Sequence, residues 1–184
     1  HHAGREVILL SSNDYLGLAT HPEVIRAAIH ATEQYGTGSG ASRLVSGTLP
    51  PHTHLETSLA TFKGTEAALL FGAGYLANIG IIPNLIGQGG LILADRLCHA
   101  SLIDGCRLSR ADLRVFRHRD CAHLESLLRR RSASRPTLII TEGLFSMDGD
   151  LAPLSDLASL AERYEATLYV DDAHGTGIMG PTGR

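Results

Sequence analysis

Short apolar runs alternate with helical patterns along most of the chain. Five runs carry few polar residues and predict buried strands: Ala67–Phe71, Leu91–Ala94, Leu113–Phe116, Thr137–Thr141 and Thr167–Asp171. Helical spacing lies between them, near residues 75–86, 99–109, 121–131 and 153–164. Strands without polar alternation are typical of a sheet covered on both faces, and strand–helix–strand order favours parallel crossovers. We therefore expect a three-layer α/β/α fold with a mainly parallel sheet.

The first part of the chain follows a different pattern. Thr20 is expected to cap a helix that runs to Tyr35. A second helix is expected from His52 to Lys63, ended by Gly64, with three apolar residues facing inward: Leu55, Leu59 and Phe62. A glycine-rich loop at residues 36–43 separates the two. We expect an N-terminal segment at residues 1–50 and a larger domain at residues 51–184.

Composition narrows the class of protein. A length of 184 residues predicts about one domain, and 43% hydrophobic with 19% charged residues is typical of a soluble globular protein. A net charge of −3 gives no global attraction to nucleic acid or to an anionic membrane, and no apolar run approaches the ~18 residues of a membrane span. The three cysteines, an odd number, favour reduced thiols and a cytoplasmic location.

Polar and glycine residues follow the predicted strands, where ligands of parallel sheets bind. Gly72-Ala73-Gly74 opens a helix, and backbone N–H groups at such a point suit a phosphate. With Asp95 about 20 residues further on, the same segment also fits a dinucleotide-binding fingerprint. Both interpretations remain open on this pattern alone.

Two further strand ends suggest a heteroaromatic ligand. His99 begins a predicted helix, where the positive helix end favours a neutral ring that can stack or shuttle a proton. Asp171 and Asp172 point to opposite faces of their strand, so one carboxylate alone can face a given ligand. A carboxylate aimed at a ring nitrogen keeps it protonated, which suits a pyridine cofactor.

Other kinds of site are not supported. The chain has no paired Cys-x-x-Cys spacing for zinc, and Asp148-x-Asp150 lacks the rest of a calcium loop, so no metal site is predicted. It also lacks the G-x-S-x-G elbow of serine hydrolases and the G-x-x-x-x-G-K loop of Walker-type nucleotide sites.

Several motifs in order resemble the α-oxoamine synthases, pyridoxal-phosphate (PLP) enzymes of fold type I. The motifs are Ser11–Leu18, Gly38–Thr48, Gly64–Phe71, His99–Gly105, Thr141–Leu154 and Val170–Gly177. Within that family the segment is most similar to the branch that serves biotin synthesis. The number of motifs favours PLP over a dinucleotide. Mild departures are Gly72-Ala73, where serines are commoner, and His118-Arg119-Asp120, where His-Asn-Asp is usual.

The resemblance implies a role for each of seven residues. Gly74 and Tyr75 are implied to bind the cofactor phosphate, Ser146 to lie against the cofactor, and Asn13 to border the substrate. His99 is implied to stack on the pyridine ring and to border the substrate. Asp171 is implied to pair with the ring nitrogen, and His174 to contact the ring hydroxyl. The catalytic residues implied are thus His99, Asp171 and His174.

The reaction implied is a decarboxylative condensation of L-alanine with pimeloyl-CoA, or the acyl carrier protein thioester. The products are 8-amino-7-oxononanoate, CoA and carbon dioxide, and the enzyme is implied to be a homodimer. Two alternatives are carried: a sister synthase that uses glycine (glycine C-acetyltransferase or 5-aminolevulinate synthase), and a dinucleotide-binding module. Residues 42–47 look more like the biotin enzyme than like either sister.

Enzymes of this family hold the cofactor as a Schiff base on a lysine downstream of the segment that matches Val170–Gly177. Lys63 is the only lysine in the chain and falls at the end of a predicted helix, where a cation is favourable without any catalytic role. We therefore expect a truncated part of the large PLP-binding domain, with little or no activity by itself.

Overall fold

The computed structural model describes residues 4–184, which form two compact units. The first extends to Leu70 and includes Ile178–Arg184, and the second is Phe71–Gly177. The first contains a 3-10 helix η1 (Leu18–Thr20) and the helices α1 (Pro22–Tyr35) and α2 (Pro50–Lys63). Among the described residues, no helix is both long and apolar enough to cross a membrane. The predicted domain boundary near residue 50 stays a prediction.

Helix α1 differs from its expected start. Its N-cap is His21, whose Nδ1 accepts a hydrogen bond from the Glu23 N–H at 3.3 Å. The expected cap, Thr20, instead ends η1. Neither α1 nor α2 has a buried residue, so the inward burial expected along α2 is not observed, and Leu55 is 42% exposed. The end of α2 is as predicted, because Gly64 adopts the left-handed conformation at φ 69°.

The glycine-rich loop of the first unit is fixed by one ion pair. The Arg43 guanidinium donates to both carboxylate oxygens of Glu56, at 2.5 and 3.0 Å. Glu56 Oε1 also accepts the Leu70 N–H at 2.8 Å. The hydrogen bonds from Arg43 and then from Leu70 lower the pKa of Glu56 to about 2. One carboxylate thus ties the loop and the segment before residue 71 to α2.

Acid is expected to release this anchor. A lowered folded-state pKa means that Glu56 stabilises the fold above its ordinary pKa of 4.5 and loses that contribution as the pH falls towards about 2. A carbon-13 NMR titration of the Glu56 carboxyl should therefore show a midpoint near 2. In an Arg43→Gln variant the midpoint should rise, and an unchanged midpoint would contradict the pairing.

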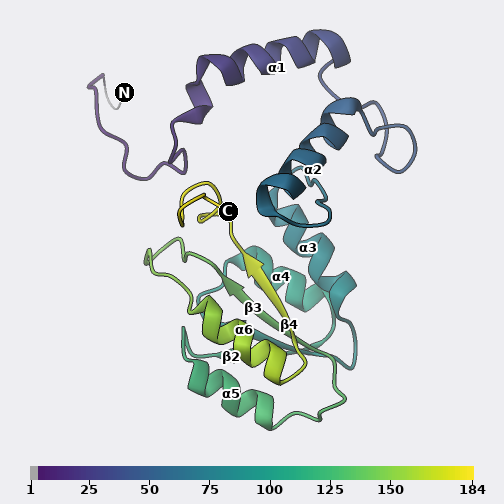
Figure 1. Ribbon diagram of the computed structural model, residues 1–184, viewed down its shortest axis with the longest axis vertical. Coiled ribbons are helices and arrows are strands. Elements are labelled where there is room, and N and C mark those ends of the chain that lie inside the picture. Colours follow the sequence, from purple (N-terminus) through teal and green to yellow (C-terminus); the bar gives the residue numbers. More distant parts are fainter. Residues whose placement is uncertain (1–3) are drawn as a thin grey trace. The chain divides into compact units, whose positions relative to one another are not determined.

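The second unit is a four-stranded parallel sheet in the order β2-β1-β3-β4 (Figure 1). Its strands are β1 (Leu91–Asp95), β2 (Asp112–Phe116), β3 (Thr137–Glu142) and β4 (Thr167–Asp171). Its helices are α3 (Gly74–Leu85), α4 (Ala100–Leu108), α5 (Cys121–Arg129) and α6 (Leu154–Arg163). Strands and helices alternate along the chain, which is the order that parallel crossovers require.

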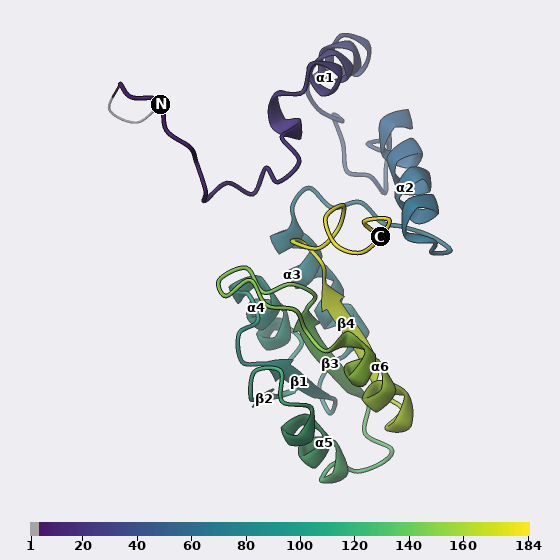
Figure 2. The same cartoon turned by 60° about the vertical axis from the view of Figure 1, so that its left-hand side comes forward.

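Two apolar clusters cover the two faces of the sheet. Alternate strand residues, including Leu93 and Ile139, pack with Leu124 of α5 and Leu157 of α6. The intervening ones, including Ile92 and Ile140, pack with residues of α3 and α4. Figure 2 shows the two helix pairs on either side of the strands. The predicted three-layer α/β/α architecture with a parallel sheet is confirmed.

The predicted strand Ala67–Phe71 is wrong. These residues have no regular secondary structure and pair with no strand in the described part of the chain. An apolar run becomes a strand only when a neighbour satisfies its backbone groups. Here the Leu70 N–H is satisfied by the Glu56 carboxylate instead.

Close packing of α3 against α4 depends on Gly105. A Cβ at this position would lie 2.7 Å from the Asn78 carbonyl oxygen and 2.9 Å from Ile82 Cδ1. We expect Gly105→Ala to lower the free energy of unfolding by up to about 2 kcal/mol, since the clash costs about 1–3 kcal/mol and helix propensity returns ~1 kcal/mol. Urea unfolding measures this. Gly87→Ala is the control, because its Cβ would meet nothing closer than 3.9 Å.

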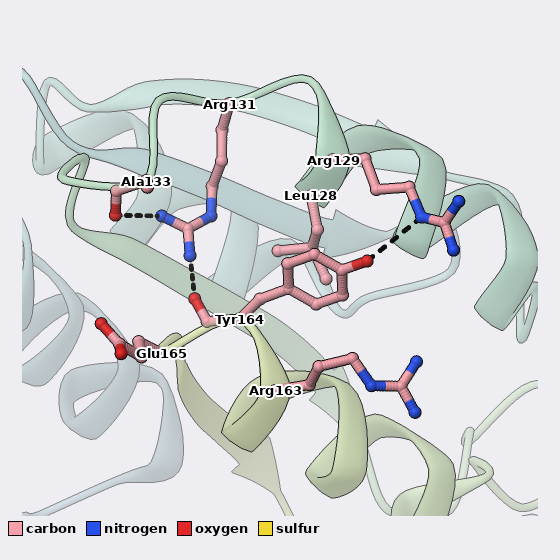
Figure 3. A pocket seen from close by; sticks show the side chains of 7 residues that line it. All are labelled: Leu128, Arg129, Arg131, Ala133, Arg163, Tyr164 and Glu165. Atoms are coloured by element: carbon pink, nitrogen blue, oxygen red, sulfur yellow. Dashed lines mark hydrogen bonds between the residues drawn. The ribbon is translucent and has the colours of Figure 1, made fainter.

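A hollow of about 290 Å³ lies near the amino ends of β3 and β4, at the opposite edge of the sheet from their carboxyl ends (Figure 3). It is lined by residues that end α5 and α6 and that precede β3 and β4, among them Arg131, Arg163 and Tyr164. Arg131 donates to backbone carbonyls of Ser132, Ala133, Arg135 and Tyr164 and so joins two loops. Arg129 and Arg163 both donate to Glu125. These guanidinium groups are used in holding the fold together.

Candidate functional site

Acidic residues end three of the four strands: Asp95 ends β1, Glu142 ends β3 and Asp171 ends β4. Side chains alternate along each strand, so these residues divide between the two faces. Glu142 and Asp171 interact with groups of α3 and of the α4 N-terminus, whereas Asp95 interacts with the segment between β2 and α5. The carboxyl edge of the sheet therefore has two separate polar clusters.

The first cluster centres on Asn78 of α3, whose side chain is buried. Its Nδ2 donates to Asp171 Oδ2 at 2.8 Å and to Ser101 Oγ at 2.9 Å, and its Oδ1 accepts from the Tyr169 hydroxyl at 2.8 Å. The other oxygen of Asp171 accepts the Ala173 N–H at 3.0 Å. Both carboxylate oxygens of Asp171 therefore have fixed donors. We call Asn78, Ser101, Tyr169 and Asp171 the amide network.

His99 joins this network at the start of α4. It is the N-cap residue, and its Nδ1 accepts the Ser101 N–H at 3.2 Å and lies 2.8 Å from Ser101 Oγ. Because Nδ1 accepts a backbone N–H, a neutral ring carries its proton on Nε2. The His99 backbone N–H donates to Glu142 Oε1 at 2.6 Å.

Glu142 is a buried carboxyl beside the predicted site residues. Burial raises its pKa, and the negative charge of Asp171 raises it further, against the lowering effects of the His99 N–H and of the His99 and His174 rings. Geometry places two of these residues directly, because Asp171 pairs in register with Glu142 and His99 donates to it, and His174 follows β4 by three residues. Three of the predicted residues are thus brought to one edge of the sheet.

The second cluster is on the opposite face, and we call it the histidine bridge. His118 Nδ1 lies 2.8 Å from Asp95 Oδ1, and His118 Nε2 lies 2.9 Å from Asp150 Oδ2. Arg119 donates to both carboxylates, through its N–H to Asp95 and its guanidinium to Asp150. The Phe145 ring packs edge-on against His118 with centroids 4.5 Å apart.

The histidine bridge fixes the segment that follows β3. Residues Leu144 and Leu151 form an antiparallel bridge, and Asp150 follows the turn between them. Burial lowers the pKa of His118, but its hydrogen bonds to Asp95 and Asp150 raise it more, so the net shift is upward. The hydrogen bond from His118 lowers the pKa of Asp150. The His118 ring thus joins two carboxylates.

The remaining predicted residues lie in three places. Gly74 and Tyr75 begin α3, one turn before Asn78, and the N-cap Ala73 offers no side-chain hydrogen bond to that helix end. The Tyr75 hydroxyl donates to Asp104 of α4 at 3.0 Å. Ser146 is exposed in the turn that the histidine bridge holds. Asn13 lies in the first unit, where its Oδ1 accepts from the Tyr15 hydroxyl at 3.4 Å. Their roles stay predictions.

Sequence reasoning gave no role to Asn78, Ser101, Tyr169, Glu142 or His118. Some signals for them exist in the chain. Asn78 is four residues after Gly74, so both lie on the same side of one helix, and Tyr169 is two residues before Asp171, so both point to the same face of β4. His118 gives no such signal, because its partners are 23 and 32 residues away.

Comparison with known proteins agrees with this architecture. Residues 5–183 match the sequence profile of the family described as aminotransferase class I and II. The chain is 60% identical over 181 residues to an 8-amino-7-oxononanoate synthase of Geobacter sulfurreducens, an alignment that covers 98% of this chain and 46% of that protein. The chain thus spans about half the length of the curated relatives it matches.

Solved structures give the same result. A serine palmitoyltransferase from S. paucimobilis, solved with a bound PLP–myriocin aldimine, superposes with a TM-score of 0.96 at 39% identity, over 99% of this chain and 47% of that one. An 8-amino-7-oxononanoate synthase from Francisella tularensis superposes with a TM-score of 0.78 at 31% identity, over 94% of this chain and 47% of that one. The chain therefore belongs to the aminotransferase class I and II family, whose cofactor is pyridoxal phosphate.

Proposed function

We propose that this chain is part of an enzyme that condenses L-alanine with pimeloyl-CoA, or with the acyl carrier protein thioester, in biotin synthesis. The observation that carries the proposal is the 60% identity to an 8-amino-7-oxononanoate synthase across nearly the whole chain. The serine palmitoyltransferase structure, with a TM-score of 0.96 at 39% identity, contains a PLP aldimine and so supports PLP chemistry for this chain. The products are 8-amino-7-oxononanoate, CoA and carbon dioxide.

The donor set fits pyridoxal phosphate. The start of α3 has no side-chain cap, so the backbone N–H groups at Gly74 and Tyr75 are suited to a phosphate. His99 presents a flat ring whose Nδ1 is already engaged, and Asp171 presents a carboxylate whose direction is fixed. We assign the phosphate to Gly74 and Tyr75, the ring face to His99 and the ring nitrogen to Asp171.

When bound, pyridoxal phosphate serves as an electron sink for the α-carbon of the amino acid. The task assigned to Asp171 is to hold a proton on the ring nitrogen, which a fixed carboxylate favours by its charge. His99 covers the ring and excludes water, and its Nε2–H remains available to a substrate group. We assign His174 to the ring hydroxyl, Ser146 to the cofactor and Asn13 to the substrate.

The test uses the complete protein that the gene encodes, supplied with pyridoxal phosphate, L-alanine and pimeloyl-CoA. Release of the CoA thiol and a product with the mass of 8-amino-7-oxononanoate are expected. Parallel reactions pair glycine with acetyl-CoA or with succinyl-CoA. Faster turnover in either would replace this proposal with a sister synthase. Binding of a nicotinamide dinucleotide without uptake of pyridoxal phosphate would replace it with a dinucleotide-binding module.

The resemblance also predicts a homodimer and a cytoplasmic location. Light scattering on the complete protein measures the first, since a dimer has twice the mass of one chain. A mass that stays at one chain across micromolar concentrations would contradict it.

A further inference from the structure

We infer that Asn78 is the positioning residue of the site, because one buried amide fixes both Asp171 and His99. This inference rests on the proposed function, since it concerns how these two side chains are presented to pyridoxal phosphate. Asn78 does not need to touch the cofactor. It acts through the two residues assigned to the ring nitrogen and the ring face.

The orientation of the Asn78 amide is determined by its partners. Asp171 Oδ2, at 2.8 Å, is a carboxylate oxygen that can only accept when ionised, so the NH₂ group must face it. The second hydrogen of Nδ2 is directed at Ser101 Oγ at 2.9 Å. The amide oxygen then faces the Tyr169 hydroxyl at 2.8 Å, which donates to it. Each of these groups has one arrangement of donors and acceptors.

The same logic continues through Ser101 to His99. Ser101 Oγ accepts from Asn78, and its hydroxyl hydrogen is left for His99 Nδ1 at 2.8 Å. Nδ1 cannot donate in return, because it accepts the Ser101 N–H. The hydrogen bonds therefore run from Tyr169 to Asn78 and then branch to Asp171 and, through Ser101, to His99. The proton of a neutral His99 ring is placed on Nε2 as a result.

Close helix packing makes this arrangement possible. Asn78 is on α3 and Ser101 is on α4, and both side chains are buried. A Cβ at Gly105 would lie only 2.7 Å from the backbone carbonyl oxygen of Asn78. Buried polar groups that are all satisfied hold a unique geometry, whereas a single missing partner leaves a costly unpaired group. The network thus has little freedom to reorient.

Asn78→Asp is the sharpest test, because it preserves the size of the side chain. It replaces the donor to Asp171 by a second carboxylate, which repels Asp171 and cannot donate to Ser101. We expect the dissociation constant of pyridoxal phosphate, followed by its absorbance in the complete protein, to rise by about tenfold to a hundredfold. The affinity should recover as the pH falls, because a protonated acid can donate again.

Asn84→Asp on the same helix is the matched control. Asn84 is exposed, and its amide donates to the Gly80 carbonyl of α3. This variant should bind the cofactor like the wild type at every pH. Thermal unfolding of each variant without cofactor separates a loss of fold from a loss of positioning.

Two milder variants decide the question if Asn78→Asp does not fold. Ser101→Ala removes only the branch to His99 and should weaken binding by about threefold to tenfold while changing the nitrogen-15 NMR shifts of the His99 ring. Tyr169→Phe removes the hydroxyl that donates to the Asn78 amide oxygen, and it should weaken cofactor binding for that reason. Wild-type affinity in both variants, with unchanged His99 ring shifts in Ser101→Ala, would overturn the role of Asn78 and leave the proposed function intact. Failure of the wild type to take up pyridoxal phosphate would overturn both.

Discussion

Asp171→Asn is expected to reduce condensation by about a thousandfold, to the background rate, while the protein still binds pyridoxal phosphate. The substitution removes the negative charge of the carboxylate that we assign to face the ring nitrogen, and it leaves the size of the side chain unchanged. The new amide oxygen can still accept the hydrogen bond from Asn78, and only the bond from the exposed Ala173 N–H is lost, so the fold should be retained. Turnover of L-alanine and pimeloyl-CoA, together with the absorbance of bound cofactor, measures both effects.

Asp156→Asn provides the control for this experiment. Asp156 is an exposed residue of α6, and the same loss of charge there should leave turnover unchanged. Near-normal turnover in Asp171→Asn would contradict the role assigned to this carboxylate and, with it, the proposed position of the cofactor.

His118→Leu is expected to lower the free energy of unfolding by about 2–3 kcal/mol. The variant leaves Asp95, which is 1% exposed, without the ring that faces it, and it frees Asp150 from the second ring nitrogen. This loss is smaller than the about 3–5 kcal/mol that follows from breaking a fully buried pair, because the His118 side chain is 22% exposed. Denaturant unfolding at pH 6 measures the loss.

The pH dependence of that difference is the internal check. The folded state raises the pKa of His118, so its stabilising effect is complete below its ordinary pKa of 6.5 and declines as the pH rises through the higher folded value. The gap between wild type and variant should therefore narrow from pH 6 towards alkaline pH. A gap that widens over this range would rule out a protonated ring between the two carboxylates.

Much of the second unit could be predicted from sequence, because buried parallel strands and amphipathic helices leave strong periodic signals. The strands at Leu91–Asp95 and Thr137–Glu142 were predicted to within one residue for this reason. The run Ala67–Phe71 has an equally apolar pattern, yet no strand forms. The pattern shows that residues are apolar, but strand formation depends on a partner elsewhere in the chain.

The candidate site was predictable only in part. His99 and Asp171 follow strands, so the general rule for parallel sheets points to them. Asn78 is buried within an apolar helix and looks like an ordinary core residue until its partners at Ser101, Tyr169 and Asp171 are in place. The histidine bridge is harder still to predict, because its residues come from three separate parts of the chain: the end of β1, the segment after β2 and the segment after β3. Such long-range hydrogen bonds have no local pattern.

The position of β4 has a practical consequence for handling the protein. In the described part of the chain β4 pairs with β3 alone, so the other side of Thr167–Asp171 presents unpaired backbone N–H and C=O groups. Such an edge can template intermolecular strand pairing. Expressed as these 184 residues, the chain should therefore aggregate through β4 as its concentration rises, and amides of β4 should exchange with solvent faster than those of β3, which lies between two strands.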